Sequence, residues 1–128
     1  MLDPASTANL VAALLAVNFY PVDRAYALMP AFAERGLLDP AKVAALPHAE
    51  LIAAMTAAGY DRGGFVPILS FRLYSLMEAI ASGSLDALVA LAATGQEAEF
   101  VATLEAIPGF GPRTASTALQ LFRASPTA

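Results

Sequence analysis

The sequence contains no cysteine and only one histidine, and charged side chains make up 14% of its 128 residues. Without cysteine, disulfide bonds, thiolate catalysis and cysteine-bound metal clusters are excluded. A single histidine argues against a zinc site, because such sites draw most of their ligands from cysteine and histidine. We expect His48 to be a solvated residue at the start of a helix, with no catalytic role.

Long hydrophobic runs are also missing. The longest clear run, Leu10 to Val17, ends at Asn18 and falls well short of the roughly 18 apolar residues that a membrane-spanning helix needs. Asp3 and Pro4 precede this run, where a signal peptide would carry positive charge. We therefore expect a soluble, cytoplasmic protein.

Hydrophobic residues are nevertheless abundant, at 58% of the chain with a mean hydropathy of +0.60. A chain of this length fits one domain, here residues 1–128, and can bury a real core. The apolar composition also predicts that some apolar surface contacts a partner or a second copy of the chain.

The balance of charge is acidic, with a net charge of −4 and a pI near 4.7. Strong nonspecific binding to nucleic acid needs several basic side chains that neutralise phosphates, so any contact with DNA must be local. The basic residues are scattered along the sequence: Arg24, Arg35, Lys42, Arg62, Arg72, Arg113 and Arg123.

Proline and glycine divide the sequence into helical segments with short connections. No segment alternates apolar and polar residues over a strand's length, so we expect an all-α fold, a compact helical barrel or bundle that ends in a helix-hairpin-helix at about residues 96–123. The expected helices cover residues 6–19, 22–35, 40–46, 48–58, 65–81, 85–94, 96–106 and 112–123. Ser6 or Thr7 should cap the first, Pro30 should bend or split the second, and Ser84 should cap the sixth. We expect residues 125–128 to be a frayed end.

The most informative segment is Ile107-Pro-Gly-Phe-Gly-Pro-Arg-Thr-Ala115, which interrupts one apolar helical pattern and starts another. Glycines two apart leave no Cβ between the backbone amides and a ligand, and a proline suits the first turn of a helix. The free amides and the positive end of the helix dipole would favour a phosphate there. The alternative is a purely structural turn between two helices. Arg113 and Thr114 add groups that proteins use to bind DNA phosphates.

This segment, with Leu104 before it, is similar to the helix-hairpin-helix of the endonuclease III superfamily of base-excision DNA glycosylases. Two further stretches resemble that family in order and separation. Leu10 to Asn18 resembles its opening helix, and Leu51 to Tyr60 resembles the approach to a loop that precedes a long helix. The resemblance covers about Ala8 to Phe122.

The resemblance implies a six-helix barrel domain whose hairpin holds the backbone of DNA through main-chain amides, here those of Gly109 and Gly111. It implies that Asn18 fills the gap left by an extruded base and that Tyr60 lies in a loop that wedges into the opposite strand. The alternatives are a helix C-cap for Asn18 and a half-buried aromatic for Tyr60. The residues expected to contact DNA are Pro108, Gly109, Phe110, Gly111, Arg113, Thr114, Asn18, Tyr60 and Arg62. A monovalent cation at the hairpin carbonyls is implied by the same analogy, with no other cofactor and no iron–sulfur cluster.

Departures from the family argue against its chemistry. Arg113 stands where bifunctional members carry the lysine that forms a Schiff base, and a guanidinium keeps its charge at any accessible pH. Residues 124–128 contain no counterpart of the catalytic aspartate, and we expect the family's second domain to be absent. We interpret five other carboxylates as solvated helix-face residues: Asp23, Asp61, Glu97, Glu99 and Glu105.

Three hypotheses follow. The first is a non-catalytic, glycosylase-like protein linked to DNA repair, which binds DNA backbone weakly through its hairpin and loses binding on Gly109→Val or Gly111→Val. The second is a homodimerisation or protein-interaction module on the same fold. The third is a monofunctional glycosylase with an unrecognised catalytic acid.

Overall fold

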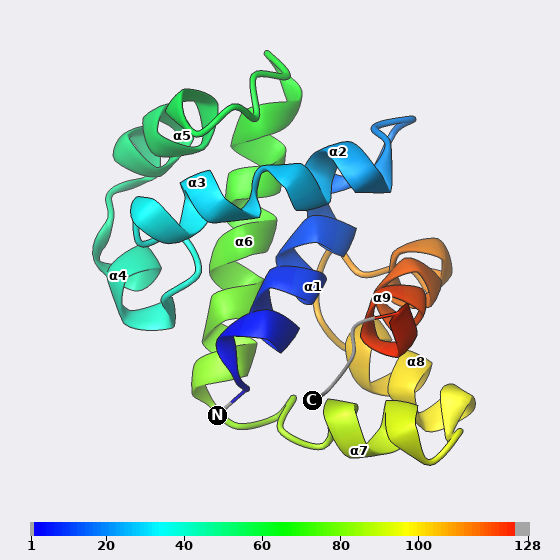
Figure 1. The fold of residues 1–128 in the computed structure, drawn as a ribbon. Coiled ribbons are helices and arrows are strands. Elements are labelled where there is room, and N and C mark those ends of the chain that lie inside the picture. The colour runs from blue at the N-terminus through cyan, green and yellow to red at the C-terminus, as the bar shows by residue number, and fades with distance from the viewer. Residues whose placement is uncertain (1, 125–128) are drawn as a thin grey trace.

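A computed structural model describes residues 2–124, and this part of the chain is helical and contains no strand (Figure 1). The helices are α1 (Pro4–Leu15), α2 (Val22–Ala27), α3 (Met29–Glu34), α4 (Pro40–Ala45), α5 (His48–Ala57), α6 (Phe65–Ala81), α7 (Leu88–Ala93), α8 (Glu97–Glu105) and α9 (Pro112–Ala124). The all-α prediction is therefore confirmed. The expectation of a frayed end at residues 125–128 lies outside the described residues.

Two helices, α1 and α6, form the centre of the fold (Figure 1). Helices α2 to α5 lie on one side of this pair, where α4 and α5 pack on α6 and α2 packs on α1. Helices α7 to α9 lie on the other side, where α9 packs on α1 and α8 packs on α9. This arrangement buries α1 almost completely, from Ser6 to Leu15.

Helix α1 begins earlier than the sequence predicted. The carboxylate of Asp3 accepts hydrogen bonds from the Ser6 amide (2.8 Å) and the Ser6 hydroxyl (3.0 Å), so Asp3, not Ser6 or Thr7, is the N-cap. These bonds hold the pKa of Asp3 below its ordinary value. Pro4 then occupies the first helical position, where its missing N–H leaves no carbonyl without a partner.

The segment expected over residues 22–35 is split, as its proline predicted: α2 ends at Ala27 and α3 begins at Met29. Pro30 cannot donate the next helical hydrogen bond. The helix expected at residues 85–94 also differs from the prediction. Ser84 does not cap it, because the Ser84 hydroxyl donates to the carbonyl of Ala79 at the end of α6 (3.0 Å). Helix α7 therefore starts only at Leu88.

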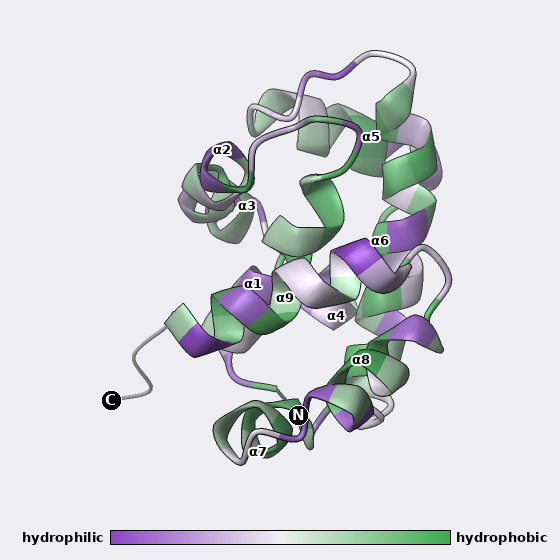
Figure 2. Cartoon of the chain, turned by 90° about the vertical axis from the view of Figure 1, so that its right-hand side faces the viewer, coloured by the Kyte–Doolittle hydropathy of each residue, from purple (hydrophilic) through white to green (hydrophobic). Residues whose placement is uncertain are grey.

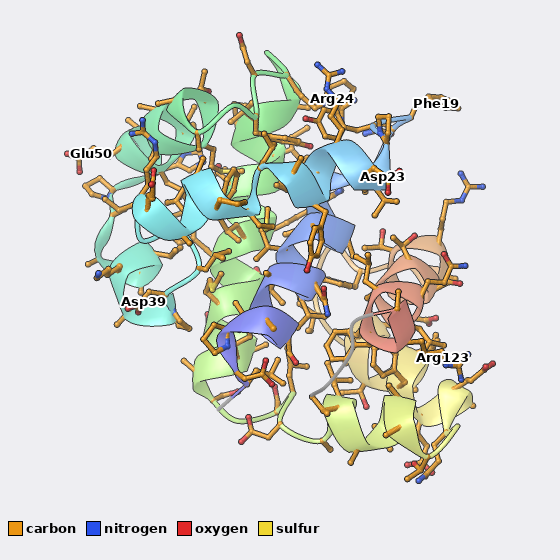
Figure 3. All side chains as sticks on the ribbon, in the orientation of Figure 1. Phe19, Asp23, Arg24, Asp39, Glu50 and Arg123 are labelled. Atoms are coloured by element: carbon orange, nitrogen blue, oxygen red, sulfur yellow. The ribbon has the colours of Figure 1, made fainter. Side chains whose placement is uncertain are left out.

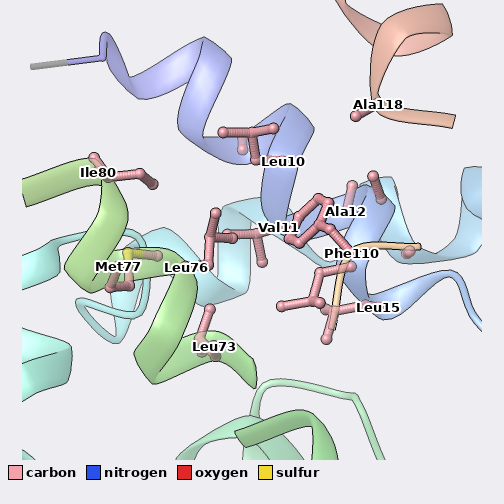
Figure 4. Packing of buried hydrophobic residues seen from close by; sticks show 14 of the residues in the cluster. Leu10, Val11, Ala12, Leu15, Leu73, Leu76, Met77, Ile80, Phe110 and Ala118 are labelled. Carbon is pink, nitrogen blue, oxygen red and sulfur yellow. The ribbon is translucent and has the colours of Figure 1, made fainter. Parts of the chain in front are cut away.

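The core is continuous across both sides of the central pair. Figure 4 shows Leu10 and Leu15 of α1 facing Leu73 and Leu76 of α6, and these four side chains are fully buried. Every buried side-chain nitrogen or oxygen of the described residues has a hydrogen-bond partner. Between residues 2 and 124, no helix is both long enough and apolar enough to cross a membrane.

Candidate nucleic-acid interface

The connection between α8 and α9 is a tight turn anchored at both ends. The amide of Phe110 donates to the carbonyl of Ile107 (3.1 Å), and Gly109 has a φ of +94°, a value that glycine adopts without strain. Proline followed by glycine of positive φ is the pattern of a type II turn. Ile107 and Phe110 are buried, whereas Pro108 and Gly111 are exposed. The turn is therefore fixed by its apolar side chains while its tip faces solvent.

The amides at this tip have no partner within the described chain. Helix α9 starts with the bond from the Ala115 amide to the Gly111 carbonyl (3.0 Å), so the amides of Arg113 and Thr114 precede its first hydrogen bond. The amides of Gly109 and Gly111 also form no hydrogen bond between residues 2 and 124. Four backbone donors thus have no hydrogen-bond partner in the described chain.

An arginine from the central helix packs beneath the turn. A Cβ built on Gly109 would lie 2.6 Å from Cδ and 2.7 Å from Cγ of Arg72, so the aliphatic part of Arg72 occupies the space that only glycine leaves free. Arg72 is half-buried and has no carboxylate within ion-pair distance among the described residues. Its positive charge therefore has no counter-ion among residues 2–124.

Helix α9 itself carries no acidic residue, although its neighbour α8 carries three. Arg123, near the end of α9, pairs with Glu97 of α8 (2.6 Å). Arg113 is exposed beside the open amides and has no such partner in the described chain. The first turn of α9 thus combines a dipole end, open donors and one free guanidinium.

Two residues of the turn segment do not present their side chains to solvent as expected. The Phe110 ring points into the core beside Leu15 (Figure 4), and its amide is occupied by Ile107. Thr114 is buried, although its backbone amide has no hydrogen-bond partner in the described chain. Phe110 is thus an anchor of the turn, which corrects its assignment as a contact to DNA.

The loop 16–21, which connects α1 and α2, has an unusual backbone. Asn18 and Phe19 have φ values of +55° and +68°, a backbone region that residues other than glycine and asparagine rarely adopt. The Phe19 side chain is fully exposed, at 102% of its reference area. Figure 3 shows it extending from the tip of the loop, beside Asp23 and Arg24 of α2. Asn18 is exposed too and is not a C-cap, since α1 ends at Leu15 with Ala16 as its cap.

Arg62 fixes this loop. Its guanidinium donates to the carbonyls of Val17 (2.7 Å) and Asn18 (3.0 Å). It also lies over the rings of Phe65 (4.7 Å) and Tyr20 (5.0 Å), measured to the ring centroids. Arg62 was expected to contact DNA, but these bonds show that it holds the backbone of the loop.

Tyr60 is buried completely, which corrects its assignment to a wedge that enters DNA. Its hydroxyl donates to the carbonyl of Leu15 at the end of α1 (2.8 Å) and accepts from Arg62 (3.3 Å). Burial raises the pKa of Tyr60, and the charges of Arg62 and Arg72 partly offset this effect. Tyr60 thus joins α1 to the loop that precedes α6.

The loop 16–21 and helix α9 lie on the same side of the molecule. Both are on the right-hand side in Figure 1, and both face the viewer in Figure 2. Along the loop, Arg24 lies over the ring of Tyr20 (5.5 Å), on which Arg62 also lies. Two arginines thus lie at the loop, Arg24 and Arg62, and two lie at the turn, Arg72 and Arg113.

His48 is not solvated as expected. It begins α5, stacks on Phe71 (3.9 Å between centroids), and its Nε2 lies 2.6 Å from the Ser70 hydroxyl. That hydroxyl donates to the carbonyl of Pro67 (2.6 Å), so it accepts from the imidazole and has no proton to transfer to it. The pair joins α5 to α6 and is not a nucleophile with its base.

The carboxylates considered as candidate acids are all exposed: Asp23, Asp61, Glu97, Glu99 and Glu105. Within residues 2–124, no three or more histidine, aspartate or glutamate side chains gather as a metal site would require. No protein-family model, curated protein or solved structure matches this chain with statistical significance.

Reading the sequence alone missed Arg72 and Phe19. Arg72 is one arginine in an apolar helix, and no sequence signal connects it with Gly109. For Phe19, the preceding asparagine gave a weak signal, because asparagine tolerates a positive φ and often marks a turn.

Proposed function

We propose that this protein binds the sugar-phosphate backbone of DNA at the turn between α8 and α9, as a non-catalytic, glycosylase-like protein linked to DNA repair. The observation that carries the proposal is the set of amides at Gly109, Gly111, Arg113 and Thr114 that have no hydrogen-bond partner in the described chain. Beside them lie Arg72 and Arg113, whose guanidinium groups have no ion-pair partner among the same residues. Backbone amides at a helix N-terminus bind anions, and arginine matches the geometry of a phosphate. The similarity of the Ile107–Ala115 segment to the hairpin of the glycosylases agrees with this ligand.

The proposed binding is weak and independent of base sequence. Backbone amides contact phosphate oxygens and cannot distinguish base edges. The net charge of −4 opposes DNA outside this local region. If Arg72 and Arg113 neutralise two phosphates, the logarithm of the binding constant should fall with the logarithm of salt concentration with a slope of about −2, since each duplex phosphate contributes about −0.9.

The proposal includes no lyase step. Arg113 is exposed at the position of the family's nucleophilic lysine, and its guanidinium remains protonated and cannot form a Schiff base. Its role in the proposal is to bind a phosphate oxygen through two N–H donors.

The direct test is Gly111→Val. A Cβ at Gly111 meets no atom within 4 Å, and Gly111 does not need a positive φ, so the chain should fold with a side chain that covers the open amides. We expect at least a tenfold loss of affinity for a short DNA duplex at low salt, or about 1.4 kcal/mol, by fluorescence anisotropy.

The matched control is Gly64→Val. Gly64 is also a helix N-cap with open space around its Cβ, so both variants carry the same loss of about 1 kcal/mol or less in helix capping. Gly64→Val should bind DNA as the wild type does. Equal affinities for all three proteins would remove the turn from the proposal.

A second candidate function is self-association through α6. Phe65, Ile68 and Phe71 follow one another at a spacing of three residues and are 40%, 50% and 59% exposed. Such a contiguous apolar surface is typical of an interface. We expect Ile68→Glu to shift sedimentation of the concentrated protein toward the monomer without changing DNA affinity. A wild-type protein that sediments as a monomer at about 100 μM would rule out this candidate, since specific interfaces usually bind more tightly than that.

A further inference from the structure

The loop 16–21 has two features that are energetically unfavourable: an exposed aromatic side chain and a strained backbone. Phe19 leaves its whole side chain in water, and both Asn18 and Phe19 adopt a positive φ. A backbone strained in this way persists only where the surrounding structure enforces it, and such strain is concentrated at ligand-binding sites. The loop therefore needs an explanation outside the packing of the core.

The structure shows what enforces this conformation. Arg62 donates to the carbonyls on either side of the bend, those of Val17 and Asn18, and the Tyr60 hydroxyl binds the carbonyl of Leu15. Tyr20, directly after Phe19, packs edge-on against the buried Tyr60 ring (5.2 Å between centroids) and turns away from solvent. Phe19 is thus held outward on a rigid base.

The charges around Phe19 favour an anionic ligand. Arg24 lies over the ring of Tyr20, and Arg62 lies over the same ring and donates to the carbonyls of Val17 and Asn18. Two exposed carboxylates, Asp23 and Asp61, are the neighbouring negative groups in sequence. Arg24 and Arg62 have no ion-pair partner in the described chain, so their charges are available to an anion. An exposed ring beside cations is the combination by which proteins bind single-stranded nucleic acid, where bases stack on aromatic side chains.

We infer that Phe19 stacks on an unpaired base, so that the proposed DNA-binding face prefers a single strand or an unpaired segment to an intact duplex. The inference rests on the proposed function, since the turn between α8 and α9 binds the sugar-phosphate backbone of the same DNA. In an intact duplex both faces of each internal base are covered by neighbouring bases, whereas a single strand offers them at little cost. Arg62 is the positioning residue, because it holds Phe19 in place through the two carbonyls.

The first test is a fluorescence measurement on the Phe19→Trp variant. Because the chain contains no tryptophan, this variant would carry a single indole, at position 19. Addition of short oligothymidine should quench the fluorescence of this exposed indole, because stacking on a base quenches tryptophan. The same strand within a duplex should quench it far less. Phe71→Trp is the control: Phe71 is 59% exposed on α6 and stacks on His48, outside this face, so its indole should not respond.

The second test distinguishes the contribution of the Phe19 ring from that of Arg62, which positions the ring. Wild-type protein should bind oligothymidine about tenfold more tightly than the duplex of the same length, and Phe19→Ala should remove this preference, because stacking of one base commonly changes affinity by this amount or more. Phe19→Ala should leave duplex affinity unchanged. Arg62→Met alone should remove the preference for a single strand, as Phe19→Ala does. Combined with Phe19→Ala, it should cause no further loss of affinity. Arg35→Met removes an equal charge from the end of α3 and should have no effect.

The outcomes distinguish this inference from the proposed function. If Phe19→Ala keeps the full preference for a single strand, or if Phe19→Trp is quenched equally by both forms, the inference is wrong even where Gly111→Val still weakens duplex binding. If no DNA form binds the wild type, both fail, and Phe19 would then serve a protein partner. An additional loss from Arg62→Met in the Phe19→Ala background would mean that Arg62 binds phosphate itself and does not act by positioning Phe19.

Discussion

Replacement of Gly109 by valine is expected to lower the free energy of unfolding by about 3 kcal/mol or more, the sum of backbone strain and overpacking. Gly109 has a φ of +94°, and its added Cβ would lie 2.6 Å from Cδ of Arg72. The φ strain remains because Phe110 anchors the turn in the core, and the collision requires the Cγ–Cδ part of Arg72 to move. Urea unfolding followed by circular dichroism measures the loss, and Gly111→Val, in open space, is the matched control.

This result would change how the turn is tested. The sequence alone treats Gly109→Val and Gly111→Val as equivalent, since either side chain would cover the amides. The structure distinguishes them: the first variant damages the fold, and only the second tests the ligand. In an Arg72→Ala background, Gly109→Ala should lose less stability than in the wild type, because the collision disappears while the φ strain remains. Equal losses in the two backgrounds would contradict the packing of Arg72 under the turn.

Replacement of Tyr60 by alanine should lower the free energy of unfolding by about 3–5 kcal/mol, the range for a buried aromatic truncated to alanine. The ring is fully buried against Tyr20, and its hydroxyl binds the Leu15 carbonyl at the end of α1. Tyr26→Ala is the control, since Tyr26 is 41% exposed and should change stability by about 0.5 kcal/mol or less. A Tyr60→Ala protein as stable as Tyr26→Ala would mean that the ring is not part of the core.

Tyr60→Phe separates the hydroxyl from the ring through its pH dependence. Removal of the buried hydrogen bond should cost about 1–2 kcal/mol at neutral pH. Burial raises the pKa of Tyr60 above its ordinary value of 10.0, so the folded state keeps the proton after the unfolded state has lost it. This contribution to stability is complete below about pH 10 and is lost as the pH rises further. The difference between wild type and Tyr60→Phe should therefore shrink above pH 10, and a difference that stays constant would contradict the buried hydroxyl.

Helix boundaries were predicted well where a single local signal decided them. Asp39 caps α4 directly before Pro40, and α6 runs from Phe65 to Ala81 as expected, because caps and first-turn prolines act within a few residues. Predictions were wrong where two groups competed for one role. At α1, the Asp3 carboxylate takes the amide and the hydroxyl of Ser6, and at α7 the Ser84 hydroxyl binds the end of α6 instead.

The sequence by itself determined the all-α fold and a turn whose amides have no hydrogen-bond partner in the described chain. Both depend on interactions between near neighbours, such as the positive φ of Gly109 and the proline that begins α9. The tertiary structure decided which side chains surround those amides. Only packing of α6 and α1 against the turn brings Arg72 under Gly109 and buries Phe110. Likewise, Arg62 can hold Phe19 outward only because the loop before α6 folds onto the end of α1, and no sequence period encodes a contact between such distant segments.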